Sequence, residues 1–161
     1  MRLTFATHPM PNHKMPYEIK VTRRVEFSET DMAGIVHYSN FFKYMETAEH
    51  GFYRTIGHSA VMSHLDPPLG WPRIHADCQF RKPLRFEDEV EIHLLVERIG
   101  TSSLTFQFRF TRLNPGPKEE VARGRLTAVC VTRAAEGGLK SFPIPAELRD
   151  KIQVAPAHWL A

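Results

Sequence analysis

Between residues 73 and 130, four separate runs of alternating apolar and polar side chains follow one another, and this pattern constrains the fold more than any other feature. Successive side chains of a strand point to opposite faces, so a period of two predicts an antiparallel sheet with one apolar face. Residues 17–27 have the same character. A sheet of five or six strands is therefore expected. Its apolar positions would include Ile74, Ala76, Cys78 and Phe80; Val90, Ile92, Leu94 and Val96; Leu104, Phe106, Phe108 and Phe110; and Ala122, Leu126, Ala128 and Cys130.

Residues 40–56 carry the one strong helical pattern of the chain. Their apolar members recur every three or four residues and so share one face of a helix, and the charged members share another. Ser39 or Asn40 is suited to cap the start of this helix and Gly57 to end it. One long helix and several half-apolar strands bury their apolar faces together if the sheet curls around the helix, which predicts an α+β fold. A short final helix is expected over residues 147–152. The apolar face holds Phe41, Met45, Ala48, Phe52 and Ile56, and the polar face holds Lys43, Glu46, His50 and Arg54.

The chain has 161 residues, which is enough for one domain with a sizeable core and too few for two. We expect a flexible lead-in over residues 1–15 and a single domain over residues 16–161. No run approaches the roughly eighteen apolar residues that a membrane helix needs, and the first residues lack the apolar core of a secretory signal. The two cysteines, Cys78 and Cys130, sit in apolar strand-like runs. They are interpreted as reduced core thiols, and the protein is expected in the cytoplasm.

The charges argue against several classes of partner. Twenty-one Lys and Arg face eighteen Asp and Glu, for a net charge of +3, and the two signs are interspersed. This distribution does not indicate a nucleic-acid surface. The histidines lack the spacing of a metal site, and no Gly-x-Ser-x-Gly elbow is present. We therefore expect no metal, no nucleic acid and no membrane partner.

The stretch with most chemical information is residues 29–42, in which Asp31 and Gly34 precede the start of the expected helix. This order can aim the Asp31 carboxylate at the same point as the unpaired N–H groups of the helix's first turn, which favour negative charge. A carboxylate beside a helix end that stabilises an oxyanion provides the groups that acyl transfer requires. An Asp before a Gly-containing turn is also a common turn or cap residue, and the spacing alone leaves both interpretations open.

Residues 30–41 resemble the signature of the 4-hydroxybenzoyl-CoA thioesterase family of hotdog proteins: an Asp, a small residue with Gly, two aliphatic residues, a His and aromatic pair, and Asn at the helix start. Residues 80–88, 96–104 and 142–145 resemble later segments of the same family, so the likeness covers about residues 17–152. It implies a hotdog fold, in which a curved antiparallel sheet wraps around one central helix. It also implies a homodimer or dimer of dimers that hydrolyses acyl-CoA thioesters without a metal or other cofactor, coenzyme A being part of the substrate.

By the same resemblance, Asp31 is the catalytic carboxylate, acting as nucleophile or as general base. The backbone N–H of Tyr38 would polarise the thioester oxygen. The side chains of His37 and Tyr38 either line the acyl pocket or orient a water, or they simply pack at the helix entrance. A related hotdog branch uses a carboxylate on the helix, which draws attention to Glu46 and Glu49, although Asp31 makes that role unnecessary.

Some members of the family place basic residues in the hairpin that corresponds to residues 100–102, which is neutral here. Arg81, Lys82, Arg85 and Arg98 are the alternative candidates for binding the CoA phosphates. Other functions stay open at this point. They are an acyl-carrier-protein thioesterase, an acyl-thioester dehydratase, for which His37 is the one local histidine, and a non-catalytic module that binds acyl-CoA.

Overall fold

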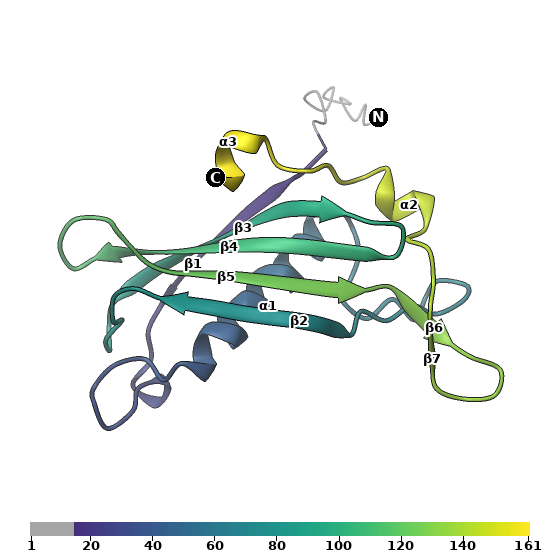
Figure 1. Cartoon of the computed structure of the whole chain (residues 1–161). Helices are drawn as coiled ribbons and strands as arrows, with labels where there is room; N and C mark the ends of the chain where they lie inside the picture. Colours follow the sequence, from purple (N-terminus) through teal and green to yellow (C-terminus); the bar gives the residue numbers. More distant parts are fainter. Residues whose placement is uncertain (1–14) are drawn as a thin grey trace, which may run out of the picture.

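A five-stranded antiparallel sheet with one long helix against it forms the body of the computed structural model, which describes residues 15–161 (Figure 1). The strands follow the order β1-β3-β4-β5-β2 across the sheet, so β1 and β2 are its edges. A second, two-stranded sheet pairs β6 with β7. The expected α+β fold is confirmed, and the lead-in expected over residues 1–15 lies outside the described residues except for Met15. The elements are β1 Glu18–Arg24, the 3-10 turn η1 Phe27–Glu29, α1 Ser39–Thr55, β2 Arg73–Phe80, β3 Glu89–Ile99, β4 Ser103–Asn114, β5 Glu119–Val129, β6 Val131–Arg133, β7 Leu139–Ser141, α2 Ala146–Arg149 and α3 Ala157–Leu160.

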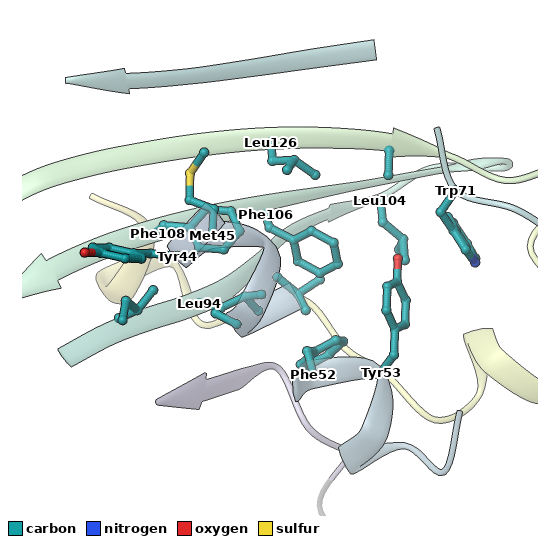
Figure 2. Packing of buried hydrophobic residues seen from close by; sticks show 14 of the residues in the cluster. Tyr44, Met45, Phe52, Tyr53, Trp71, Leu94, Leu104, Phe106, Phe108 and Leu126 are labelled. Carbon is teal, nitrogen blue, oxygen red and sulfur yellow. The ribbon is translucent and has the colours of Figure 1, made fainter. Parts of the chain in front are cut away.

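The core lies between α1 and the inner face of the sheet. Strand register places Leu94 opposite Phe108 and Phe106 opposite Leu126, and all four side chains are buried. Figure 2 shows these sheet residues facing the side chains of α1. The predicted apolar face of the helix is buried along its whole length, as the 3.6-residue period requires. The helix is buried more widely than predicted, because Tyr44 and Tyr53 beside that face are also covered.

Strand β2 departs from the prediction. Its alternation led us to expect a buried apolar face, but Ile74 is 67% exposed and Phe80 is 50% exposed. The reason is its position at the sheet edge, where no described strand covers its outer side. The β6–β7 hairpin and α3 were not predicted, because each spans only three or four residues. The helix expected over residues 147–152 is observed as the shorter α2, Ala146–Arg149, and it is not the last helix, because α3 follows it.

The start of α1 lies at one end of the sheet, beside the loop that follows β1 (Figure 1). The link from β2 to β3 meets this loop, since the Val36 N–H donates to the Leu84 carbonyl at 2.8 Å. The β2–β3 link, which is distant in sequence, therefore meets the loop and the start of α1 at this end. No helix within residues 15–161 is long and apolar enough to cross a membrane.

Candidate active site

Asp31 sits at the first corner of a tight loop between η1 and α1. Its N–H donates to the Ile35 carbonyl at 2.9 Å, and its own carbonyl accepts from Gly34 N–H at 2.9 Å. Gly34 has φ +71°, a conformation that costs other residues strain. The Ala33 N–H donates to Asp31 Oδ1 at 2.8 Å, and Oδ2 has no partner within residues 15–161. Asp31 is thus a turn residue, and the turn also fixes one carboxylate oxygen and leaves the other available.

The backbone at the start of α1 offers a donor close by in sequence. Tyr38 is the N-cap, and its N–H has no acceptor within the described part of the chain. The next donors are occupied, because Asn40 N–H bonds to the His37 carbonyl and Phe41 N–H bonds to the Tyr38 carbonyl. An N–H at a helix start carries the positive end of the helix dipole and stabilises negative charge on a nearby oxygen.

Asp31 and Tyr38 line one pocket with a volume of about 540 Å³. This size is within the range of small-molecule sites, which are mostly apolar with a few polar groups. The end of β2 and the following link form the opposite wall. The other lining residues are Ile35, Val36, Phe41, Phe80, Arg81, Lys82, Pro83 and Leu84.

His37 does not line this pocket. Its Nδ1 lies 2.8 Å from Ser39 Oγ and accepts from Ser39 N–H at 3.4 Å, and its ring packs 4.5 Å from the ring of Tyr38. These contacts occupy the histidine at the helix entrance. The expectation that the side chain of Ser39 or Asn40 caps the helix is wrong, because no side-chain cap is formed there and the Asn40 amide turns back to the Glu29 carbonyl at 2.8 Å.

The four basic candidates are not equivalent. Arg81 and Lys82 line the pocket, but they pair with Glu120 at 2.6 Å and Glu119 at 3.6 Å. Arg85 is exposed beside the loop and does not line the pocket, and its backbone N–H donates to Asp88 Oδ2 at 2.8 Å. Its guanidinium lies 3.5 Å from the Gly34 carbonyl and has no carboxylate partner among residues 15–161. Arg98 lies near the last residues of β3, beside the hairpin at Gly100 and far along the strand from the link that meets the pocket. The structure brings the first three together with Asp31 and does not bring Arg98 to them.

The two helix carboxylates have separate environments. Glu46 is 53% exposed, and Glu49 is fully buried against Arg73. Burial raises the pKa of Glu49 above its ordinary value, and Arg73 opposes this change. Neither residue lines the pocket of Asp31. Within the described chain, no group of three or more His, Cys, Asp or Glu side chains is arranged to hold a metal.

Sequence reasoning did not single out Glu29, which binds both the loop and the start of α1. Its only sequence signal is its position two residues before Asp31, because its partners come from distant segments. Phe80, Pro83 and Leu84, which supply apolar surface to the pocket, were likewise not predicted to line it.

Residues 33–117 match the thioesterase superfamily. The chain belongs to this superfamily. An Aquifex aeolicus (strain VF5) protein named "Putative esterase" is 40% identical over 86 residues, which are 53% of this chain and 66% of that protein. A solved gentisyl-coenzyme A thioesterase is 32% identical, with a TM-score of 0.69, over 81% of this chain and 99% of that one.

The fold also matches the 4-hydroxybenzoyl-CoA thioesterase of Pseudomonas sp. strain CBS-3, with a TM-score of 0.76 over 84% of this chain and 99% of that one. At 21% identity this likeness concerns the fold alone. The predicted family resemblance and hotdog fold of this thioesterase-superfamily protein are therefore confirmed.

Proposed function

We propose that this protein hydrolyses an acyl-CoA thioester to a free acid and coenzyme A, with Asp31 as the catalytic carboxylate. The observation that carries the proposal is that Asp31 and Tyr38 line one pocket of about 540 Å³ in a chain of the thioesterase superfamily. The Asp31 carboxylate would act on the thioester carbonyl carbon. The Tyr38 N–H would stabilise the oxygen on which negative charge develops.

Two routes satisfy this arrangement. In the first, Asp31 Oδ2 attacks the carbonyl carbon, the C–S bond breaks, the CoA thiolate leaves, and water then hydrolyses the acyl–Asp31 anhydride. In the second, Asp31 takes a proton from a water that attacks the carbonyl carbon directly, and the C–S bond then breaks to release the free acid and the CoA thiolate. Acid quenching during turnover, followed by mass spectrometry of the peptide that contains Asp31, separates the routes. Only the first leaves an acyl adduct on that peptide.

Arg85 is the strongest candidate for the CoA phosphates, because Arg81 and Lys82 already have carboxylate partners. A guanidinium without a competing carboxylate loses less on binding phosphate. The contacts of His37 favour the interpretation that it orders the helix start. A contribution from Arg98 would require it to reach the ligand of another protomer.

A homodimer formed through β2 fits the exposed features of this edge. An edge strand with unpaired backbone groups is a template for another strand, and β2 also exposes Ile74 and Phe80. An antiparallel pair with its twofold axis at Ala76 would place His75 opposite Asp77 of the partner subunit, so that the two groups, which lie 2.7 Å apart within one protomer, could also pair between protomers. Phe80 lines the pocket, so a copy bound here would also cover the site. Two such dimers could associate further into a dimer of dimers, which is the larger assembly that we propose.

The decisive experiment is a free-thiol release assay over aromatic, short-chain and long-chain acyl-CoAs. Gentisyl and 4-hydroxybenzoyl groups come first, because they are the acyl groups in the names of the structural neighbours. We expect hydrolysis by the wild type, and a loss of at least about 100-fold in Asp31→Asn and Asp31→Ala. Asp150→Asn changes an exposed aspartate at the C-cap of α2, away from this pocket, and is the matched control.

Undiminished turnover in Asp31→Asn would refute the catalytic role. Tight binding of acyl-CoA by a wild type that releases no thiol would favour the non-catalytic module. Activity restricted to acyl-carrier-protein thioesters would favour that class of hydrolase. The cytoplasmic location stays a prediction, consistent with the unpaired Cys78 and Cys130 and with a CoA-linked substrate.

A further inference from the structure

The carboxylate of Glu29 joins β1, η1 and α1. It forms an ion pair with Arg23 of β1, and its Oε2 accepts from Tyr44 OH at 2.9 Å and from Glu26 N–H at 2.8 Å. The Glu29 side chain is only 15% exposed. A partly buried carboxylate with three donors is held in one orientation far more firmly than an exposed ion pair.

The backbone carbonyl of the same residue closes the loop that carries Asp31. It accepts from His37 N–H at 2.9 Å and from Asn40 Nδ2 at 2.8 Å. Thr30 and Val36 form an isolated bridge just inside these contacts. The two ends of the loop over residues 30–36 are therefore fixed to each other and to the first turn of α1.

The helix contributes two of these contacts from one face, since Asn40 and Tyr44 are four residues apart. Tyr44 is fully buried, and Figure 2 shows its ring in the core with its hydroxyl pointing away from the other apolar side chains. Arg23 lies over this ring at 4.2 Å, which adds a cation–π contact. Burial, and then Glu29, raise the pKa of Tyr44 above its ordinary value, so its hydroxyl remains a donor.

We propose that Glu29 is a positioning residue, which holds the Asp31 carboxylate in the correct place relative to the Tyr38 N–H. This inference rests on the proposed hydrolysis. Glu29 does not line the pocket, so it acts through the loop and not on the substrate. Displacing a catalytic group by about 1 Å can cost about 100-fold in rate, which is the scale of effect that a loosened loop would have.

The test compares Glu29→Ala and Glu29→Gln with the wild type in the thiol-release assay. We expect Glu29→Ala to lower kcat by about 10- to 100-fold with KM little changed, because the loop and not the binding surface is disturbed. Gln keeps an oxygen for Tyr44 OH and Glu26 N–H, so it should restore part of kcat. Glu89→Ala is the matched control, since Glu89 also pairs with an arginine of β1, Arg24, but lies outside the loop.

A purely structural role is separated by repeating Glu29→Ala in the Asp31→Asn background. If Glu29 acts through Asp31, the second substitution should produce little further loss of residual hydrolysis. An equal fold-loss in both backgrounds would overturn the inference, as would an unchanged kcat or a change confined to KM. If Asp31→Asn abolishes hydrolysis but Glu29→Ala is as active as the wild type, the positioning role of Glu29 is refuted and the proposed function stands. A wild type without hydrolysis would refute the proposed function and this role together.

Tyr44→Phe removes one donor while keeping the ring, so it remains informative if Glu29→Ala fails to fold. We expect a smaller fall in kcat and faster amide hydrogen exchange over residues 30–38, with exchange in β4 and β5 unchanged. Unchanged exchange and unchanged kcat in this variant would show that the contacts to Glu29 do not hold the loop, and would overturn the inference.

Discussion

The fully buried carboxylate of Glu49 on α1 lies 2.6 Å from the guanidinium of Arg73 on β2. Tyr53 OH also points to this carboxylate, at 3.4 Å. Arg73 is the cation that compensates the buried charge, and its side chain is 33% exposed. The pair therefore connects the helix to the edge of the sheet. Removing Arg73 has a different effect from removing Glu49, because Glu49 has no access to water and Arg73 does.

Arg73→Met should destabilise the protein by about 3–5 kcal/mol, since it leaves a buried carboxylate without a counter-ion. Burial already raises the pKa of Glu49, and the loss of Arg73 would raise it further. A carboxyl whose folded pKa is raised costs stability above that pKa, and the cost disappears as pH falls toward its ordinary value of 4.5. Denaturant unfolding at about pH 8 and pH 5 should therefore show a smaller effect at the lower pH.

Glu49→Gln in the Arg73→Met background removes the buried charge and should recover much of the lost stability. The matched control is Arg125→Met, which removes the exposed partner of Glu97 and should cost about 0–1 kcal/mol. A pH-independent loss in Arg73→Met would contradict this account. All variants need the same protein concentration, because association would shift apparent stability.

Gly124→Ala should destabilise the sheet–helix contact. A methyl group at this position would overlap the sulfur of Met45 on α1 and would lie 3.4 Å from the Asp77 carbonyl. Overpacking costs about 1–3 kcal/mol, which exceeds the gain of about 0.4–1 kcal/mol from restricting the unfolded chain. In Gly70→Ala the nearest atom, of Val131, is at an ordinary 3.7 Å, so thermal unfolding should place this control near the wild type.

The parts of this fold that were predictable are those whose contacts repeat along the chain. Alternation in β3 and β4 and the helical period of α1 report burial directly, because each residue contacts the same core. The same alternation in β2 was misleading, because a sequence pattern shows which face is apolar and not what covers it. Ile74 has the pattern of a core residue and is exposed at the edge.

The candidate site likewise has a part that the sequence predicted and a part that it did not. Asp31 and the start of α1 were found because they are neighbours in sequence. The contacts of Glu29 were not found, because Arg23 and Tyr44 belong to other elements and nothing local marks their convergence. The difference between Arg85 and Arg81 likewise depends on Glu120, a residue of β5 that sequence reasoning had no basis for pairing with Arg81.

His58 should make the protein less stable in acid. Burial and the nearby Lys151 lower the pKa of His58 below its ordinary value of 6.5. The unfolded chain then binds more protons than the folded protein, so stability should fall as pH decreases through 6.5 toward the lowered pKa. His58→Gln should flatten this part of the stability profile, whereas His158→Gln, at an exposed position of α3, should leave it unchanged. Parallel profiles for the two variants would be evidence against this role.

Ile74→Lys should weaken association if β2 is the interface. A lysine on an edge strand opposes strand pairing, and Ile74 is 67% exposed, so the substitution removes little from the core of the protomer. Light scattering coupled to size exclusion should then report a lower mass than for the wild type. Leu139→Lys on β7 is the control, since Leu139 is 64% exposed and lies outside the five-stranded sheet. Equal masses for wild type and Ile74→Lys would exclude an interface that depends on this position.

Arg85→Met should weaken binding of the CoA end of the substrate and leave the chemistry intact. One charged hydrogen bond at an exposed position is worth about 1.4 kcal/mol, so KM for the acyl-CoA should rise by about tenfold with kcat retained. The same variant should hydrolyse the matching acyl-pantetheine, which lacks the nucleotide phosphates, as well as the wild type does. Arg98→Met distinguishes the candidates, because Arg98 is far from this pocket in its own protomer. A selective KM effect in Arg98→Met and not in Arg85→Met would mean that the phosphates are bound by the partner subunit, because Arg98 lies at the end of β3 that is away from the pocket of its own protomer.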